Sequence, residues 1–131
     1  MQSTASDTKK RLLSGVKPTG RPHVGNYFGA MKQFVDLQEK YETFVMIADL
    51  HALNFIQNKD EMKTLTHELV LDYLAIGLDP KKITLFKQSS VPAHTSLTWI
   101  FDTLVTVPFM MRAHAYKDAI AKDLEPSMGL F

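Results

Sequence analysis

A loop rich in glycine and proline, residues 14–22, leads into the side chains of this sequence that are best placed for chemistry on a phosphate. His23 and Asn26 stand three positions apart, with Gly25 between them. On the first turn of a helix, that spacing lets both side chains face one point, where each can donate a hydrogen bond to a phosphate oxygen. Backbone N–H groups at a helix start also favour an anion, and Gly25 lets a flat ring approach the backbone. A lone His-x-Gly-Asn is more often a plain helix entry with a capping side chain, so the context decides.

Other kinds of site find little support in the sequence. Neither of the phosphate-binding patterns G-x-x-x-x-G-K-[ST] and G-x-G-x-x-G occurs. The sequence contains no cysteine, which excludes disulfides, thiolate metal sites and thiol nucleophiles. Its five histidines are scattered, and none pairs with another at metal-ligand spacing, so no metal site is predicted.

Alternating strands and helices are predicted to position this loop. Three short apolar runs are typical of strands, and three stretches with an apolar residue at every third or fourth position are typical of helices. In chain order they are strand 12–16, helix 24–41, strand 43–48, helix 58–76, strand 83–86 and helix 93–105. This alternation predicts an α/β fold with a parallel sheet and right-handed crossovers. The loop then lies at the carboxyl end of the first strand, where such folds bind ligands.

Several residues refine the boundaries of these elements. Asn58 is predicted to cap the second helix, Gly77 to follow its last turn, and Pro108 to end the third helix. Residues 113–122 are helix-like and residues 125–129 resemble a loop. The continuous apolar run of the second strand predicts burial on both faces of the sheet.

Composition is that of a globular chain with one domain. The sequence has 131 residues, 45% of them hydrophobic, and a net charge of +1, which argues against disorder and against a strongly basic nucleic-acid surface. No apolar run approaches the roughly 18–20 residues that span a membrane. Residues 1–11 are predicted to form a flexible polar leader and residues 12–131 a partial nucleotide-binding catalytic domain. No signal peptide is recognisable at the N-terminus, so the cytoplasm is the predicted location.

The glycine-rich loop then points to a family. Ser14-Gly15-x-x-Pro18-Thr19-Gly20, followed by His23-Val24-Gly25-Asn26-Tyr27-x-Gly29-Ala30, resembles the N-terminal signature of bacterial-type tryptophanyl-tRNA synthetases. These are class I aminoacyl-tRNA synthetases, and His23–Asn26 matches their "HIGH" signature with Asn in the last place. Three further segments resemble family segments in the same order, namely 47–52, 73–80 and 86–94.

The resemblance implies a Rossmann-like fold, here the N-terminal half of a class I catalytic domain, and a reaction in two steps. ATP and tryptophan first give tryptophanyl-adenylate and pyrophosphate, and the tryptophanyl group then moves to tRNA(Trp). Mg²⁺ travels with ATP, and the family implies a homodimer. By match, His23 and Asn26 are catalytic, and His23 steadies the charge that develops on the transferring phosphate. The implied ATP-binding residues are Lys17, Pro18, Thr19, His23, Gly25 and Asn26, and the implied tryptophan-pocket residues are Leu13, Gly15, Ala48 and His51.

The sequence also departs from the family pattern. It has no Lys-Met-Ser-Lys-Ser signature, and it stops before the segment whose Asp reads the indole N–H and before the anticodon-binding helices. The family more often has Gln at the position of Lys17. Whether this chain alone is active therefore stays open. Two alternatives stay open with it: a fragment of a tyrosyl-tRNA synthetase, the nearest class I relative, and a non-catalytic truncated or split synthetase fragment.

Structural interpretations compete with functional ones at several side chains. His51 is as well suited to a structural hydrogen bond as to a ligand contact, and Asp49 beside it can cap the following turn. Four apolar residues near the end of the third helix are predicted to lie in the core or in a subunit interface rather than in a substrate pocket. They are Trp99, Phe101, Val105 and Phe109.

Overall fold

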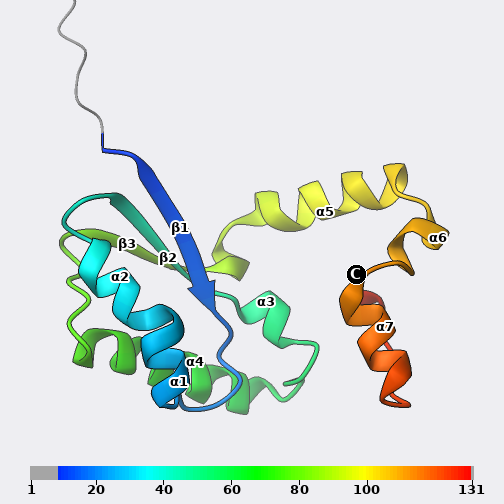
Figure 1. Cartoon of the computed structure of the whole chain (residues 1–131), viewed down its shortest axis with the longest axis horizontal. Helices are drawn as coiled ribbons and strands as arrows, with labels where there is room; N and C mark the ends of the chain where they lie inside the picture. The colour runs from blue at the N-terminus through cyan, green and yellow to red at the C-terminus, as the bar shows by residue number, and fades with distance from the viewer. Residues whose placement is uncertain (1–8, 131) are drawn as a thin grey trace, which may run out of the picture.

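The computed structural model describes residues 9–130 and contains a three-stranded parallel sheet (Figure 1). The strands are β1 (Arg11–Val16), β2 (Glu42–Ile47) and β3 (Ile83–Lys87), in the order β1-β2-β3. Both pairs are parallel, with Thr43 of β2 opposite Leu12 of β1 and Ile83 of β3. The predicted α/β fold with a parallel sheet is confirmed. Residues 1–8 of the predicted polar leader lie outside the described residues, and Arg11 already belongs to β1.

Helical segments connect the strands and continue beyond the last one. Their bounds are α1 (Val24–Asn26), a π-helical turn η1 (Tyr27–Met31), α2 (Lys32–Leu37), α3 (Asp49–Ala52), α4 (Lys59–Ala75), a 3₁₀ turn η2 (Gln88–Ser90), α5 (Pro92–Leu104), α6 (Val107–Met110), α7 (His114–Ala121) and a 3₁₀ turn η3 (Met128–Leu130).

One face of the sheet carries the core. Phe34 of α2 and Tyr73 of α4 pack together with ring centroids 6.3 Å apart, and both lie against the buried Val45 and Ile47 of β2. Met31, Leu69 and Leu78 complete this cluster. Since β2 is the central strand, its inward side chains are held between the two helices and the neighbouring strands, and these contacts fix the carboxyl ends of the strands.

The opposite face of the sheet is not covered to the same extent. Leu13, Phe44, Met46 and Phe86 point away from the helical cluster, and Leu13 is 64% exposed. The expectation that β2 is buried on both faces is therefore correct for one face only. A continuous apolar run indicates that both faces of a strand are suited to burial, but it does not identify the residues that pack on each face.

Predicted helix boundaries are confirmed in part. The Asn58 side chain accepts hydrogen bonds from the N–H groups of Asp60 and Glu61, and Gly77 has a positive φ of 104° after the last turn of α4. The first helix ends at Leu37 rather than near residue 41. Pro108 does not end α5, because α5 already stops at Leu104 and Pro108 lies in the first turn of α6, where a missing N–H costs no hydrogen bond.

The helix α5 projects from the body (Figure 1), and its apolar side chains are exposed to solvent. Trp99 and Leu104 are each 72% exposed, and Phe101 and Phe109 are more than half exposed. These residues do not belong to a core within the described chain, which leaves the subunit-interface half of that expectation. No helix of the described residues is long and apolar enough to cross a membrane.

Candidate functional site

The loop between β1 and α1 closes on itself through two side chains. His23 is the N-cap of α1, and its Nδ1 accepts a hydrogen bond from the Gly25 N–H at 3.0 Å. The Oδ1 of Asn26 accepts in turn from the His23 N–H at 3.0 Å. This reciprocal cap uses one polar atom of each side chain, and it leaves Nε2 of His23 and Nδ2 of Asn26 as the atoms suited to meet a ligand.

Gly25 is required by this arrangement. A Cβ at Gly25 would lie 2.9 Å from Cε1 of His23, closer than real Cβ contacts allow. The ring that Gly25 accommodates within the chain is thus the imidazole of His23. Any side chain at position 25 would push that imidazole out of its capping position.

The loop surrounds a small cavity of about 280 Å³ at the carboxyl end of β1. Among the predicted ATP-binding residues, Lys17, Thr19, His23 and Asn26 line it together. The other two lie beside it, since Pro18 is buried behind the loop and Gly25 is exposed on the first turn of the helix. Four side chains that the sequence spreads over ten positions therefore meet at one hollow.

Arg21 adds a contact that sequence reasoning missed. Its Nη2 lies 3.8 Å from Oδ1 of Asp72 on α4, and Arg21 also lines the small cavity. The other carboxylate oxygen, Oδ2 of Asp72, is buried and has no hydrogen-bond partner among the described residues. This ion pair joins the loop to α4. Because 51 residues separate the two side chains in sequence, no local sequence pattern predicts it.

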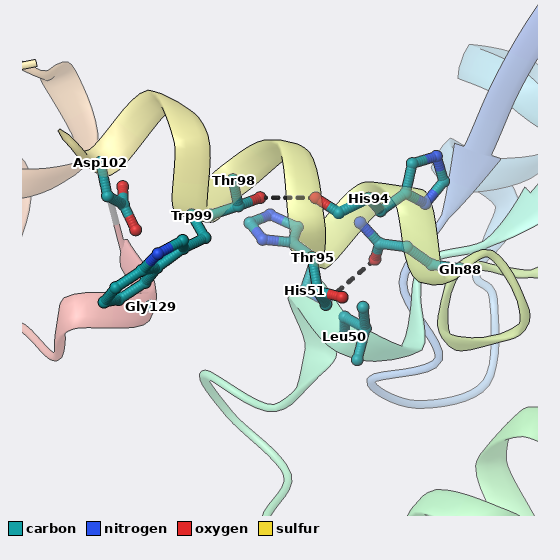
Figure 2. A pocket seen from close by; sticks show the side chains of 9 residues that line it. All are labelled: Leu50, His51, Gln88, His94, Thr95, Thr98, Trp99, Asp102 and Gly129. Atoms are coloured by element: carbon teal, nitrogen blue, oxygen red, sulfur yellow. Dashed lines mark hydrogen bonds between the residues drawn. The ribbon is translucent and has the colours of Figure 1, made fainter. Parts of the chain in front are cut away.

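A second, larger cavity of about 470 Å³ lies between α3 and α5 (Figure 2). Leu50 and His51 form one wall, Gln88 lies at its base, and α5 supplies the opposite wall through residues such as Trp99. Of the four predicted tryptophan-pocket residues, only His51 lines this cavity. Trp99, which the sequence predicted for the core or a subunit interface, contributes its indole to the α5 wall of this cavity.

The other predicted tryptophan-pocket residues lie on β1 or directly after β2. Leu13 and Gly15 belong to the less covered face of β1, and Ala48 is buried just after β2, where its N–H donates to the Val16 carbonyl at 3.0 Å. A Cβ at Gly15 would lie 2.4 Å from the carbonyl oxygen of Met46. Glycine at this position is therefore explained by the close approach of β1 and β2.

Asp49 joins the carboxyl ends of β2 and β3. Its Oδ1 accepts from the N–H groups of Leu50 at 3.0 Å and Ser89 at 2.9 Å, and its Oδ2 accepts from the Ser89 hydroxyl. The His51 N–H donates to Oε1 of Gln88 at 3.2 Å. Asp49 does bond within its own turn, as expected, but it also connects that turn to η2 across 40 residues. These bonds position the His51 wall of the larger cavity.

A cation of the smaller cavity also acts on a side chain of the larger one. Lys17 lines the smaller one, and its Nζ lies 4.7 Å from the centroid of the Phe55 ring, within cation–π range. The pKa of His51, in the larger cavity, is lowered mainly by burial and in smaller part by the charge of Lys17. The two sites are therefore electrostatically coupled, and His51 is held toward its neutral form.

Comparison with known proteins gives one consistent family. The family described as tRNA synthetases class I (W and Y) matches residues 5–131. Tryptophan--tRNA ligase of Fusobacterium nucleatum is 53% identical over 92% of this chain and 37% of its own length. The ligase of Rhodopirellula baltica is 49% identical over 92% of this chain and 38% of its own. The chain thus spans somewhat more than a third of the curated relatives it matches.

Solved structures agree with these relatives. Tryptophanyl-tRNA synthetase from Campylobacter jejuni superposes with a TM-score of 0.84 at 40% identity, covering 94% of this chain and 39% of that one. A second structure of the Campylobacter jejuni protein, complexed with ADP and tryptophan, gives a TM-score of 0.83 at 41% identity over 92% of this chain and 38% of that one.

Proposed function

The chain belongs to the class I tRNA synthetases of the W and Y group, and on that premise we propose that it is the ATP-binding part of a tryptophan--tRNA ligase. The proposed reaction joins ATP and tryptophan to give tryptophanyl-adenylate and pyrophosphate, and then transfers the tryptophanyl group to tRNA(Trp). The observation that carries the proposal is the reciprocal cap of His23 and Asn26 over a cavity at the carboxyl end of β1. Tryptophan is favoured over tyrosine because the similar ligases and the Campylobacter jejuni complex are tryptophan proteins.

The small cavity is the proposed site of the ATP phosphates. Nε2 of His23 and Nδ2 of Asn26 can each donate to a phosphate oxygen without breaking the cap that holds them in place. Lys17 adds a positive charge at the same hollow. The attack of a carboxylate on the α-phosphate builds negative charge on its oxygens, and donors fixed beforehand stabilise that charge most efficiently. Pro18, Thr19 and Gly25 shape the same site, and Mg²⁺ arrives with ATP.

The larger cavity is the proposed entrance to the tryptophan site. His51 forms its wall, and Lys17, which lines the phosphate site, lowers the pKa of His51 through its charge. A substrate carboxylate that points from the larger cavity toward the smaller one would approach both this cation and the α-phosphate. Leu13, Gly15 and Ala48 do not line the cavity, and their proposed contact with tryptophan rests on the family resemblance.

Partners and location follow from the same premise. We propose a homodimer, which the exposed apolar surface of α5 and α6 supports. The proposed location is the cytoplasm, where tRNA charging takes place. Residues 12–131 are proposed to form a partial Rossmann-like catalytic domain.

Two measurements test the proposal. The first is ATP affinity by titration calorimetry: His23→Ala and Asn26→Ala should each weaken binding by about tenfold, the value of one charge-assisted hydrogen bond. His67→Ala is the matched control, since His67 lies exposed on α4. Equal affinity for all four proteins would contradict the assignment of the ATP site.

The second measurement is ATP–pyrophosphate exchange driven by tryptophan or by tyrosine. Exchange with tryptophan alone supports adenylation by this chain and excludes the tyrosyl alternative. ATP binding without exchange supports the interpretation as a synthetase part that is inactive by itself. Exchange with tyrosine in preference to tryptophan would contradict the proposed substrate.

A further inference from the structure

The wall that α5 provides to the larger cavity has few supports of its own. His94, near the start of the helix, is half-buried, while every later residue of α5 is exposed. The side chains that face the cavity are His94, Thr95, Thr98, Trp99 and Asp102. Neighbouring turns of one helix repeat every three or four residues, so these five form a single polar and aromatic stripe. Besides this stripe, a segment distant in the sequence contributes to the lining of the cavity.

That distant segment reaches the cavity when the chain returns after α7. The side chain of Asn54, in the turn after α3, donates from Nδ2 to the carbonyl oxygen of Gly129 at 2.8 Å. The Ser127 hydroxyl donates to Oδ1 of Asn54 at 3.2 Å. Gly129 belongs to η3, and it also lines the larger cavity (Figure 2). The two segments lie 75 residues apart in sequence, so these bonds close a loop that contains all of α5.

Close packing at the same point restricts position 129 to glycine. A Cβ there would lie 2.5 Å from Oδ1 and 3.5 Å from Cγ of Asn54. The φ of Gly129 is not among the positive values of the described glycines, so the backbone itself would tolerate alanine. The added methyl group would instead displace the Asn54 amide and break its bond to the carbonyl oxygen.

We propose that Asn54 and Gly129 form a clasp that holds η3 in place in the lining of the larger cavity and so sets the space open to an aromatic amino acid. Asn54 is then a positioning residue, which acts through Gly129 and does not touch the substrate. This inference rests on the proposed function, since it takes the cavity as the entrance for tryptophan. The clasp lies away from the loop of the phosphate site, and it should affect the amino acid and not ATP.

Four variants separate the clasp from general destabilisation. Asn54→Asp keeps the shape and the acceptor for Ser127 but loses the donor to Gly129. Gly129→Ala attacks the same bond from the other side. Asn54→Asp combined with Gly129→Ala tests whether the two changes act on one bond, and Ser127→Ala removes only the weaker contact and is the matched control.

The binding probe is 4-fluorotryptophan, which barely fluoresces, so that emission of Trp99 in the cavity wall reports binding. We expect Asn54→Asp and Gly129→Ala each to weaken its binding about three- to tenfold, as the loss of one hydrogen bond would. ATP affinity should stay unchanged, and Ser127→Ala should bind as the wild type does. The double variant should be no weaker than the weaker single one, because both changes remove one interaction. Unchanged binding in both single variants, or fully additive losses, would overturn the clasp.

Hydrogen exchange measured by mass spectrometry distinguishes failure of the clasp from failure of the proposed function. In Asn54→Asp the amides of residues 127–130 should exchange faster than in the wild type. Unchanged exchange there overturns the clasp whatever the binding result. If the wild type binds neither tryptophan nor the probe while exchange is accelerated in Asn54→Asp, the proposed function fails and the clasp remains a structural contact.

Discussion

At the scale of single residues, two glycines permit close approaches in the site that a Cβ would prevent. Gly15 permits β1 to approach β2 at Met46, and Gly25 leaves room for the imidazole of His23. Neither has a positive φ among the described glycines. Neither position has room for a Cβ, because each lies against atoms that hold a cavity-lining segment in place. Substitution by alanine is therefore a direct test of each contact.

Gly15→Ala should destabilise the chain. Its Cβ would lie 2.4 Å from the Met46 carbonyl oxygen and 2.9 Å from the Met46 Cβ, so the two strands would have to separate. Overpacking of this kind costs about 1–3 kcal/mol in the free energy of unfolding. Urea denaturation measures the change. Gly29→Ala is the matched control, because a Cβ there meets no atom within 4 Å, and it should be neutral or stabilise by up to about 1 kcal/mol. Equal effects of both substitutions would contradict the close approach.

His51 should make stability depend on pH in the acid range. Burial, and then the charge of Lys17, lower the pKa of His51 in the folded state. The unfolded chain, with an ordinary histidine pKa of about 6.5, therefore takes up this proton first as the pH falls. The contribution is fully present above the unfolded value and is lost as the pH drops from about 6.5 toward the folded pKa. Between about pH 7.5 and pH 5, the midpoint of thermal unfolding should fall less steeply for His51→Gln than for the wild type. His67→Gln is the control. A steeper decline for His51→Gln would contradict the direction of the shift.

At the scale of elements, the carboxyl ends of β2 and β3 are joined by side chains rather than by further strand pairing. Asp49 accepts three hydrogen bonds, two of them from Ser89, and Gln88 accepts one from the His51 backbone. Together they hold α3 against η2, where α5 begins. The cavity wall at His51 and the wall on α5 are therefore joined at their base by one carboxylate.

Loss of the Asp49 carboxylate should loosen this junction. Asp49→Ala leaves the Leu50 and Ser89 N–H groups without their acceptor, which should reduce the free energy of unfolding by about 1–3 kcal/mol. Ser89→Ala removes only the hydroxyl bond and should cost about 1 kcal/mol or less. Chemical denaturation of the two variants measures the difference. Equal losses would mean that the backbone bonds from Leu50 and Ser89 contribute nothing.

At the scale of the whole molecule, apolar surface remains uncovered in two places. The sheet face that carries Leu13 is only partly covered, and α5 and α6 expose Trp99, Leu104 and Phe109. Contiguous exposed apolar surface of this kind marks interfaces in soluble proteins. The chain covers 37% of the length of its Fusobacterium nucleatum relative, so surfaces that pair with these faces can come from the same protein or from a second copy.

Association through α5 should be visible in solution. If two copies pair through this helix, Leu104→Glu removes one apolar contact per copy and buries two charges, and should weaken dimerisation by about 100-fold. Leu71→Glu is the control, because Leu71 is an exposed leucine of α4 at 51%. Sedimentation velocity over a range of concentrations gives the dimer fraction. Similar dimer fractions for the two variants would contradict a contact through α5.

The sequence by itself determined the local features of this protein. The order of strands and helices, the Asn58 cap, the glycine after α4 and the loop that carries His23 and Asn26 all follow from spacing and residue type over a few positions. The family, too, could be recognised from four short segments and is confirmed by the comparisons. Local conformation depends on neighbours in the chain, and those are visible in the sequence.

Only the tertiary structure decided how the predicted residues are distributed in space. It gathered Lys17, Thr19, His23 and Asn26 at one cavity, placed His51 at another, and left Leu13, Gly15 and Ala48 on β1 or directly after β2. It also revealed the bonds from Asp49 to Ser89, from Arg21 to Asp72 and from Asn54 to Gly129. Each of these contacts joins segments 40 or more residues apart, and their meeting depends on how the helices pack on the sheet. That packing is a property of the whole chain, and no short pattern encodes it.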